Sequence, residues 1–409
     1  MASLAPSRAK AELAASLPDD WGIATVRELA ILSSGTTPLR SSVDRYFRSG
    51  IVNWVKTGDL TNGVVRQTGE LITATAVEEC NCTVYPPDTV LVAMYGGFRQ
   101  IGRTGRLAVP AAVNQALCAV QLATKLVAPG FLQLWLNHRV RYWRRYAASS
   151  RKDPNITRSD VAAFLVALPP KEEQVALTRL MAQWQTAIDQ LSEFIARKRE
   201  LKRGLMQQLL TGKRRFPEFT EPWQEGRLRH LFQERRETGR EDLPLLAITN
   251  DRGVIPRDQI DRRDSSNPDK SAYKRVAPGD IGYNTMRMWQ GVSALSRLEG
   301  IVSPAYTICA PKGRIDGRFA AHLFKLPEVV HLFYRYSQGL VDDTLQLRYG
   351  NFATIKVTIP GLDEQRRIAA VLDAADREIE LLRRERELLK KQKRGLMQKL
   401  LTGQIRVKV

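Results

Sequence analysis

The residue types best suited to catalysis occur in this chain only as fragments of catalytic patterns. The stretch GFRQIGRT, Gly97 to Thr104, has the spacing of a phosphate-binding P-loop, but Arg103 replaces the lysine that reaches the outer phosphates. The following RLAVPAAV predicts a strand, whereas a P-loop leads into a helix. We therefore predict no nucleotide hydrolysis. The glycine-rich turn with Arg99, Gln100 and Arg103 is interpreted as a loop that can approach a DNA backbone or base edges closely.

Other catalytic patterns are equally incomplete. YPPD, Tyr85 to Asp88, has the two prolines of a methyltransferase target-base motif but neither its leading Asn or Asp nor its trailing aromatic residue. Glu200 and Lys202 lack the further carboxylates that a magnesium-dependent nuclease needs. The 4 histidines complete no catalytic arrangement, and we expect a non-catalytic chain without a metal site. The cysteines fit neither a disulfide framework nor a zinc site and predict reduced thiols in a cytoplasmic protein: Cys80, Cys82, Cys118 and Cys309.

Charge is the strongest signal in the composition. The 409 residues include 63 Lys and Arg against 43 Asp and Glu, a net charge of +20 with a pI near 10.0. The positive electrostatic field of such a charge favours polyanionic partners, meaning nucleic acid or an anionic membrane surface. No run of apolar residues is long enough for a signal peptide or a transmembrane helix, so no membrane association is expected. A chain of this length predicts at least two domains.

The chain repeats a stretch of its own sequence. KRGLMQQLLTG, from Lys202 to Gly212, returns 191 residues later as KRGLMQKLLTG, from Lys393 to Gly403. Walking backwards at the same offset, Glu173-Gln174 matches Glu364-Gln365. Each copy begins after prolines and ends at a glycine, which are helix start and stop signals.

Apolar residues in both copies recur at alternating steps of four and three, the pattern of a coiled coil or a long packed helix. Lys198 and Arg386 interrupt this seam at positions where the other copy is apolar, so the helices are related but not interchangeable. We predict that the two helices pair antiparallel with pseudo-two-fold symmetry. The predicted pairing residues are Leu177, Met181, Trp184, Ile188, Leu191, Ile195, Leu205, Leu209, Ile368, Leu372, Ile379, Leu382, Leu389, Leu396 and Leu400.

The helices separate two segments of similar size that share little sequence with each other. Short strands punctuated by Gly, Asn, Asp and Pro, with one or two helices closing each segment, predict α+β domains. The expected order is a tail (1–17), a first globular domain (18–168), a first helix (169–212), a linker and second globular domain (213–359), a second helix (360–403) and a tail (404–409).

Two further stretches suit nucleic-acid binding. HRVRYWRRY, His138 to Tyr146, is predicted to be helical, with Arg141, Arg144 and Arg145 toward phosphates and the aromatic residues packed inward. A surface helix with extended arginines explains this stretch equally well. In the second domain, YNTMRMWQG places three base-reading residue types in one short loop: Asn284, Arg287 and Gln290. Trp289 is expected to pack instead.

Together these features resemble the specificity (S) subunit of type I restriction-modification systems. The resemblance rests on the duplicated helix ending in KRGLMQ-[QK]-LLTG, on the entry segments PPKEEQ (169–174) and PGLDEQ (360–365), and on the domain–helix–domain–helix order. VNWVKTGDL and VNQALCAV in the first domain, and GDIGYNTMRMWQG followed by GIVSPAY in the second, look like the interior of that family's target recognition domains.

The resemblance implies a non-catalytic DNA-recognition subunit. Each target recognition domain would read one half of a bipartite, gapped DNA site, and the helical pair would set the spacer and dock two methyltransferase (M) subunits. Motor-nuclease (R) subunits would join through these. The chain itself would need no cofactor, because S-adenosylmethionine, ATP and Mg would belong to the partner subunits.

Two other classes of function are compatible with parts of the sequence. A stand-alone modifying enzyme would need a cofactor loop, for which the sequence offers no candidate, and binding of S-adenosylmethionine by the isolated chain would identify it. A coiled-coil scaffold with protein-binding globular domains would lack the sequence-specific, strongly salt-dependent DNA binding expected of a specificity subunit.

Overall fold

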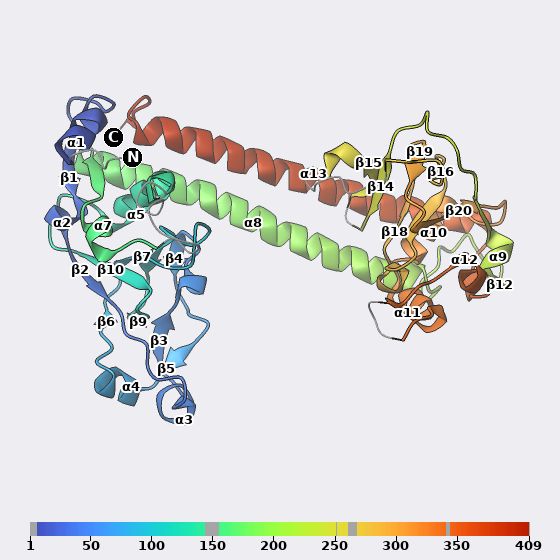
Figure 1. Cartoon of the computed structure of the whole chain (residues 1–409), viewed down its shortest axis with the longest axis horizontal. Coiled ribbons are helices and arrows are strands. Elements are labelled where there is room, and N and C mark those ends of the chain that lie inside the picture. The colour runs from blue at the N-terminus through green and yellow to red at the C-terminus, as the bar shows by residue number, and fades with distance from the viewer. Residues whose placement is uncertain (1–5, 144–154, 251, 261–267, 341–343, 409) are drawn as a thin grey trace. The chain divides into compact units, whose positions relative to one another are not determined.

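The computed structural model describes residues 6–143, 155–250, 252–260, 268–340 and 344–408 (Figure 1). Two compact units are formed by segments that are distant in the sequence. Unit 1 comprises Met1–Gln190 and Arg386–Val409, and unit 2 comprises Leu191–Glu385. Each unit therefore contains one globular domain together with part of both long helices.

The two repeated stretches lie in the longest helices, α8 (Lys171–Leu209) and α13 (Leu362–Leu401). Both begin just after proline-containing turns and carry two acidic residues in the first turn, where carboxylates interact favourably with the helix dipole. Both are followed by a glycine in the left-handed conformation, Gly212 and Gly403, each with φ of 70°. Such a residue ends a helix without the strain that a side chain would add.

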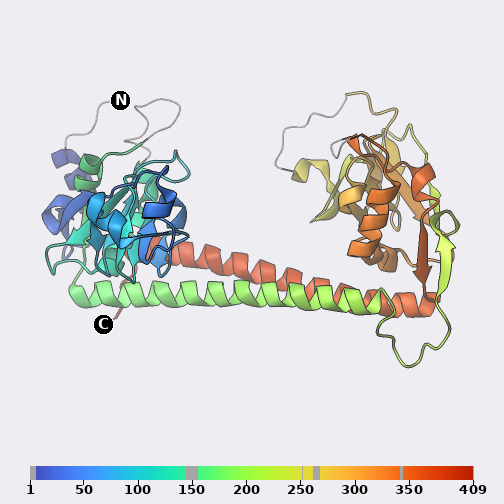
Figure 2. The same ribbon diagram turned by 90° about the horizontal axis from the view of Figure 1, so that it is seen from below.

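In unit 1 the end of α13 packs beside the start of α8 (Figures 1 and 2). Leu400 and Leu401 share a hydrophobic core with Leu177 and Met181. Farther along the pair, Lys393 Nζ donates a hydrogen bond of 2.6 Å to the side-chain oxygen of Gln185. Because residues late in α13 meet residues early in α8, the helices are antiparallel here.

Unit 2 holds the complementary halves of the same helices. Leu209 and Leu210 at the end of α8 pack with Ile368 and Leu372 at the start of α13. Lys202 Nζ lies 2.6 Å from Asp376, and Lys198 Nζ lies 2.7 Å from Glu378. The seam lysine at position 198 thus contacts a carboxylate of the opposite helix. All fifteen residues predicted for helix pairing are buried or half-buried.

The domain of unit 1 is built on two sheets and the β1–β11 pair. The larger sheet has the order β2-β10-β7-β8-β4 and the smaller has the order β5-β3-β9-β6. Its strands are β1 (Gly22–Thr25), β2 (Ala30–Ser34), β3 (Val52–Val55), β4 (Gly63–Val65), β5 (Leu71–Ile72), β6 (Val84–Tyr85), β7 (Val90–Ala93), β8 (Thr104–Leu107), β9 (Ala111–Val113), β10 (Leu117–Leu122) and β11 (Leu165–Leu168). Its short helices are α1 (Pro6–Ala14), α2 (Val26–Leu29), α3 (Val43–Tyr46), α4 (Ala74–Glu79), α5 (Pro129–His138) and α7 (Arg158–Ala162), with 3₁₀ turns at Thr57–Asp59 and Val140–Tyr142.

Strand β7 is buried on both faces, which is why its sequence is continuously apolar. Val90 and Val92 face the core that contains α5, α8 and the end of α13. Leu91 and Ala93 face a second core between the two sheets. The strand therefore joins the globular domain to the helical pair.

Unit 2 has a four-stranded sheet of order β13-β20-β17-β18 and three two-stranded pairs, β12-β21, β14-β15 and β16-β19. Its strands are β12 (Gln224–Arg227), β13 (Phe232–Glu234), β14 (Leu246–Thr249), β15 (Gly253–Pro256), β16 (Lys274–Val276), β17 (Ile281–Asn284), β18 (Ser293–Leu295), β19 (Gly300–Val302), β20 (Tyr306–Pro311) and β21 (Lys356–Ile359). Its short helices are α9 (Leu228–Leu231), α10 (Gly317–Leu323), α11 (Pro327–Tyr336) and α12 (Tyr349–Phe352), with 3₁₀ turns at Arg257–Gln259 and Met288–Gln290. The predicted α+β class is confirmed.

A buried glutamine makes the same three contacts in each unit. The side-chain oxygen of Gln174 accepts from the backbone N–H of Ala128, and its NH₂ group donates to the carbonyls of Leu126 and Pro169. The side chain of Gln365, 191 residues later, makes the matching set with Asp316, Arg314 and Pro360. These contacts place Ala128 of the first domain and Asp316 of the second at equivalent positions.

An arginine after each long helix contacts the start of the other long helix in the same way. Arg406, after α13, donates twice to Glu173 at 2.7 Å. Arg215, after α8, donates twice to Glu364 at 3.0 and 2.8 Å. Because the arginines and the glutamates are each 191 residues apart, the repeated sequence builds two equivalent junctions inside one chain.

Candidate nucleic-acid interface

The GFRQIGRT stretch lies in the connection between β7 and β8. β8 follows directly at Thr104, which confirms the predicted strand and excludes the P-loop arrangement. Gly96, Gly97 and Gly102 have φ of 108°, 72° and 72°, so three glycines let the chain reverse tightly. The loop presents Tyr95 at 44% and Phe98 at 53% exposure.

The predicted continuous helix through HRVRYWRRY is wrong. Helix α5 ends at His138, and a 3₁₀ turn, Val140–Tyr142, follows. The aromatic residues draw the chain inward, because Tyr142 and Trp143 pack against Phe164 with ring centroids 5.0 and 4.4 Å apart. The inward packing of these aromatic residues was therefore predicted correctly. Arg141 is exposed, and Arg144 and Arg145 lie outside the described residues.

His138 does not add to the positive charge of this stretch at neutral pH. Burial, and to a smaller extent the charge of Arg139, lower its pKa to about 4. The imidazole is therefore neutral above that pH, and the charge of the stretch comes from its arginines.

The fold brings these two sequence motifs of the first domain together. A Cβ atom on Gly102 would lie 2.0 Å from Cδ1 of Trp143, so the loop backbone rests directly on the indole. A small hollow is lined by residues of both motifs: Phe98, Ile101, Val140, Arg141 and Trp143. The candidate interface of the first domain is thus one surface.

The candidate loop of the second domain connects β17 and β18. Arg287 and Gln290 are exposed, whereas the side-chain oxygen of Asn284 accepts the backbone N–H of Met286 at 3.0 Å. Asn284 thereby uses its side-chain oxygen to shape the loop. Trp289 is half-buried, donates to the carbonyl of Met286 and packs edge-on against Tyr334, as its predicted packing role requires.

The two candidate loops occupy the same place in their domains. Val92 pairs with Thr104 across one hairpin, and Tyr283 pairs with Ser293 across the other. Each loop ends on a left-handed glycine shortly before the second strand, Gly102 with φ of 72° and Gly291 with φ of 75°. The sequence does not reveal this equivalence, because the loops differ in length and in nearly every residue.

The candidate side chains of the first loop differ in accessibility. Arg99 is exposed, whereas Gln100 and Arg103 are half-buried. Gln100 folds over the loop itself, since a Cβ atom on Gly96 would lie 2.3 Å from its side-chain oxygen. Arg99 and Arg141 are therefore the side chains most open to a phosphate or a base.

Two negative findings hold for the part of the chain that the structure describes. Within it, no group of three or more His, Cys, Asp or Glu residues is placed to hold a metal ion. Among the same residues, no helix is both long and apolar enough to cross a membrane.

The family model described as "Type I restriction modification DNA specificity domain" matches residues 18–209 and 318–391, more than half of the chain. The chain belongs to this family. It is a type I restriction-modification specificity subunit, a class of non-catalytic DNA-recognition components.

Individual relatives agree with this assignment. The type I restriction enzyme MjaVIII specificity subunit of Methanocaldococcus jannaschii is 26% identical over 306 residues, covering 67% of this chain and 71% of the relative. The crystal structure of a type I S subunit from M. genitalium has a TM-score of 0.57 at 14% identity, covering 93% of this chain and 95% of that one. A chain from a structural study of complex assembly and conformational transition of the type I R-M system has a TM-score of 0.55 at 16% identity, covering 95% of this chain and 99% of that one. These structures share the fold.

Much of the repeat in this specificity subunit is used inside the chain. Leu209 and Leu210 are buried in unit 2, and Leu400 and Leu401 are buried in unit 1. The leucines of the LLTG ends are therefore buried within the chain and not accessible to another subunit.

The repeat also has a part that faces solvent. Gly204 and Gly395 lie inside long helices, are exposed, and a Cβ atom on either would meet nothing within 4 Å. Glycine inside a helix costs about 1 kcal/mol relative to alanine, and packing within the chain gives no reason for it here. Arg203 and Arg394 lie beside them and are also exposed.

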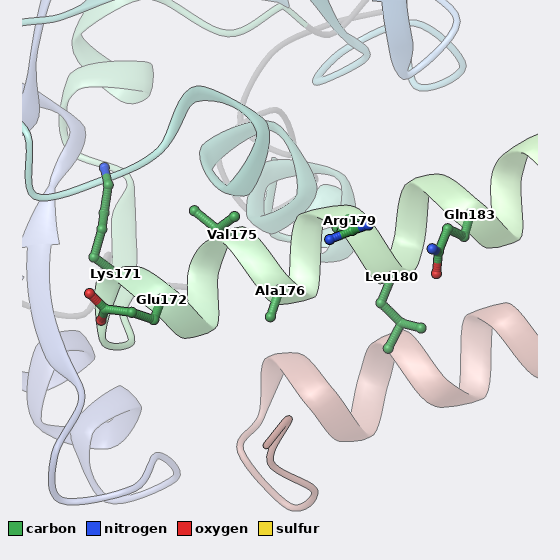
Figure 3. Close-up of a pocket in the computed structure, with 7 residues that line it drawn as sticks. All are labelled: Lys171, Glu172, Val175, Ala176, Arg179, Leu180 and Gln183. Atoms are coloured by element: carbon green, nitrogen blue, oxygen red, sulfur yellow. The ribbon is translucent and has the colours of Figure 1, made fainter. Parts of the chain in front are cut away.

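The structure also has a shallow groove along the start of α8, which does not include the exposed glycines (Figure 3). The residues 191 positions farther on differ at every lining position, so the groove is not repeated in sequence on α13. It is lined by Lys171, Glu172, Val175, Ala176, Arg179, Leu180 and Gln183.

Proposed function

We propose that each globular domain of this specificity subunit recognises one half of a bipartite, gapped DNA site. The observation that carries the proposal is that two loops of different sequence occupy the same β-hairpin position in the two domains. Equivalent placement gives both domains the same mode of approach to DNA, and different side chains give each domain its own base preference. The exposed side chains that we propose to contact DNA are those of Arg99, Arg141, Arg287 and Gln290.

The remaining candidates act less directly in this proposal. Gln100 and Asn284 shape their loops, and Arg103 is half-buried. Arg144 and Arg145 lie outside the described residues, and their proposed contact with phosphates rests on the sequence alone. The net charge of +20 supplies the long-range attraction to DNA that such an interface requires.

In the same proposal the paired helices set the spacer between half-sites and dock two methyltransferase subunits, one on each repeated stretch. The exposed glycines at 204 and 395 support it, because a residue without a side chain lets a partner helix approach the backbone closely. Motor-nuclease subunits then join through the methyltransferase subunits. S-adenosylmethionine, ATP and Mg belong to those partners, and this chain holds none of them.

A methylome tests the proposal. The chain is expressed with its neighbouring methyltransferase gene in a modification-free host, beside a control lacking the chain, and methylated bases are mapped. We expect a two-part motif with a fixed gap only when the chain is present, and replacement of residues 18–168 should change one half alone. A stable complex that produces no new motif would refute DNA recognition and favour the coiled-coil scaffold with protein-binding globular domains.

A further inference from the structure

A polar junction holds the recognition loop of the first domain at its C-terminal end. Thr104, the first residue after the loop, donates its hydroxyl to the side-chain oxygen of Asn137 on α5 at 2.8 Å. The NH₂ group of Asn137 donates at 3.0 Å to the carbonyl of Asn62, in the turn before β4. Asn62 in turn accepts the backbone N–H of Thr104 at 3.0 Å. Asn137 thus links the loop end to a turn about forty residues earlier in the chain.

The second domain has a junction at the same place, made by a different residue. Lys325 Nζ donates at 2.7 Å to the carbonyl of Gly291, the left-handed glycine two residues before β18. The same ammonium donates at 2.9 Å to the side-chain oxygen of Asn250, in the turn between β14 and β15. A side chain again connects the loop end to a distant turn, as Asn137 does in the first domain together with Gln133, which donates to the carbonyl of Gly63 and to the Thr104 hydroxyl.

Two observations show that these junctions are equivalent. The glutamine contacts align Ala128 with Asp316, and the same offset aligns Asn137 with Lys325. The turns that they hold are also similar in sequence, since Thr-Asn is followed by Gly-Val directly in TNGVV (61–65) and after two intervening residues in TNDRGV (249–254). The fold therefore keeps the junction in both domains while its chemistry changes from an amide to an ammonium.

We propose that Asn137 and Lys325 are positioning residues for base recognition, each fixing the recognition loop of its own domain against the neighbouring Thr-Asn turn. This inference rests on the proposed function of the two loops. Side chains that read bases must be held to within a fraction of an ångström, which requires support from hydrogen bonds behind them. Neither residue needs to touch DNA for its loss to alter the bases that a domain accepts.

Lys325 donates its two hydrogen bonds from a site that disfavours a positive charge. Burial, with a smaller effect from the charge of Lys202, lowers the pKa of Lys325 to about 8, so the site disfavours its charge. Both of its hydrogen-bond acceptors are neutral oxygens. The loop end that it holds has little room to shift, because a Cβ atom on Gly291 would lie 3.0 Å from Val330 of α11.

The test uses the assembled modification complex and oligonucleotides that vary one base at a time across both half-sites. Lys325→Met keeps the aliphatic stem and removes both hydrogen bonds, and Asn137→Leu does the same in the first domain. Lys312→Met is the matched control, because it also removes a lysine that donates to a backbone carbonyl, that of Arg229, away from the loop. Methylation rate is measured for each oligonucleotide.

We expect Lys325→Met to reduce discrimination about ten-fold, or about 1.4 kcal/mol, at one or more bases of the second half-site and to leave the first half-site unchanged. Asn137→Leu should do the reverse, Lys325→Arg should restore most of the discrimination, and Lys312→Met should match the wild type. If Lys325→Met does not assemble, Asn250→Ala decides, because it removes one acceptor from an exposed turn and should relax the same bases.

Unchanged discrimination in these variants, or an equal loss in both half-sites, would overturn the positioning role. A failure of the proposed function is distinguishable, because the wild-type complex would then show no two-part motif at all.

Discussion

The contact between Gly102 and Trp143 gives a quantitative test of how the first recognition loop is held. Gly97 and Gly102 lie in the same loop with the same φ of 72°, but a Cβ atom on Gly97 would meet nothing within 4 Å, whereas one on Gly102 would lie 2.0 Å from the indole. Replacing either by alanine incurs the left-handed backbone cost of about 1 kcal/mol. Only Gly102→Ala must also displace a buried ring.

Trp143 has little freedom to move, because it is 1% exposed and stacks on Phe164 with a centroid distance of 4.4 Å. Overpacking of a buried site costs about 1–3 kcal/mol. We therefore expect Gly102→Ala to be less stable than Gly97→Ala by that amount. For a unit of this size the difference corresponds to a melting temperature lower by about 2–12 °C.

Unfolding of the two variants is followed by tryptophan fluorescence, which reports mainly on unit 1 because five of the 7 tryptophans lie there. Gly97→Ala serves as the matched control for backbone strain. Equal stability of Gly102→Ala and Gly97→Ala would show that the Trp143 indole does not restrict the loop backbone at Gly102. In the assembled complex, Gly102→Ala should also weaken methylation at the first half-site more than Gly97→Ala does.

Three further predictions concern other parts of the chain. Gly204→Ala and Gly395→Ala should each stabilise the isolated chain by about 1 kcal/mol in chemical denaturation, and should weaken methyltransferase-subunit binding in a titration if the exposed glycines form the docking surface. Because the pKa of His138 is lowered to about 4 in the folded chain, the unfolded chain binds more protons between about 4 and the ordinary value of 6.5, so stability should fall as the pH drops through that range. His138→Gln should reduce the loss between pH 7 and pH 5, and an unchanged loss would show that other groups cause it. Burial raises the pKa of Cys118 to about 12, so iodoacetamide should label the half-buried Cys80 in the folded chain and Cys118 only after unfolding, as peptide mass mapping would show.

The long helices follow from sequence because their determinants are local. Apolar steps of four and three, prolines before the first turn and a glycine after the last act over a few residues, so α8 and α13 are predicted closely. The residue that a seam residue contacts on the opposite helix cannot be predicted from such local signals. That Lys198 meets Glu378 depends on how two segments about 180 residues apart are aligned.

The basic stretch after α5 was predicted in part. Aromatic residues spaced among arginines indicate an inward and an outward side, and Tyr142 and Trp143 do face inward. The helix ends at His138, earlier than predicted. After this end the rings of Tyr142 and Trp143 pack on Phe164. Phe164 is distant in the sequence, so local propensity contains no information about it.

The duplicated helix, the α+β class, the family and the candidate loops can all be inferred from the sequence, because repeats, periodicity and residue types are properties of the linear chain. Which of these features belong together depends on the folded structure. It placed two unrelated loops at one hairpin position, buried the LLTG leucines within the chain, and gave Asn137 and Lys325 the same junction in different chemistry. The physical reason is that burial and hydrogen bonding depend on neighbours brought from distant segments, and only the folded chain specifies those neighbours.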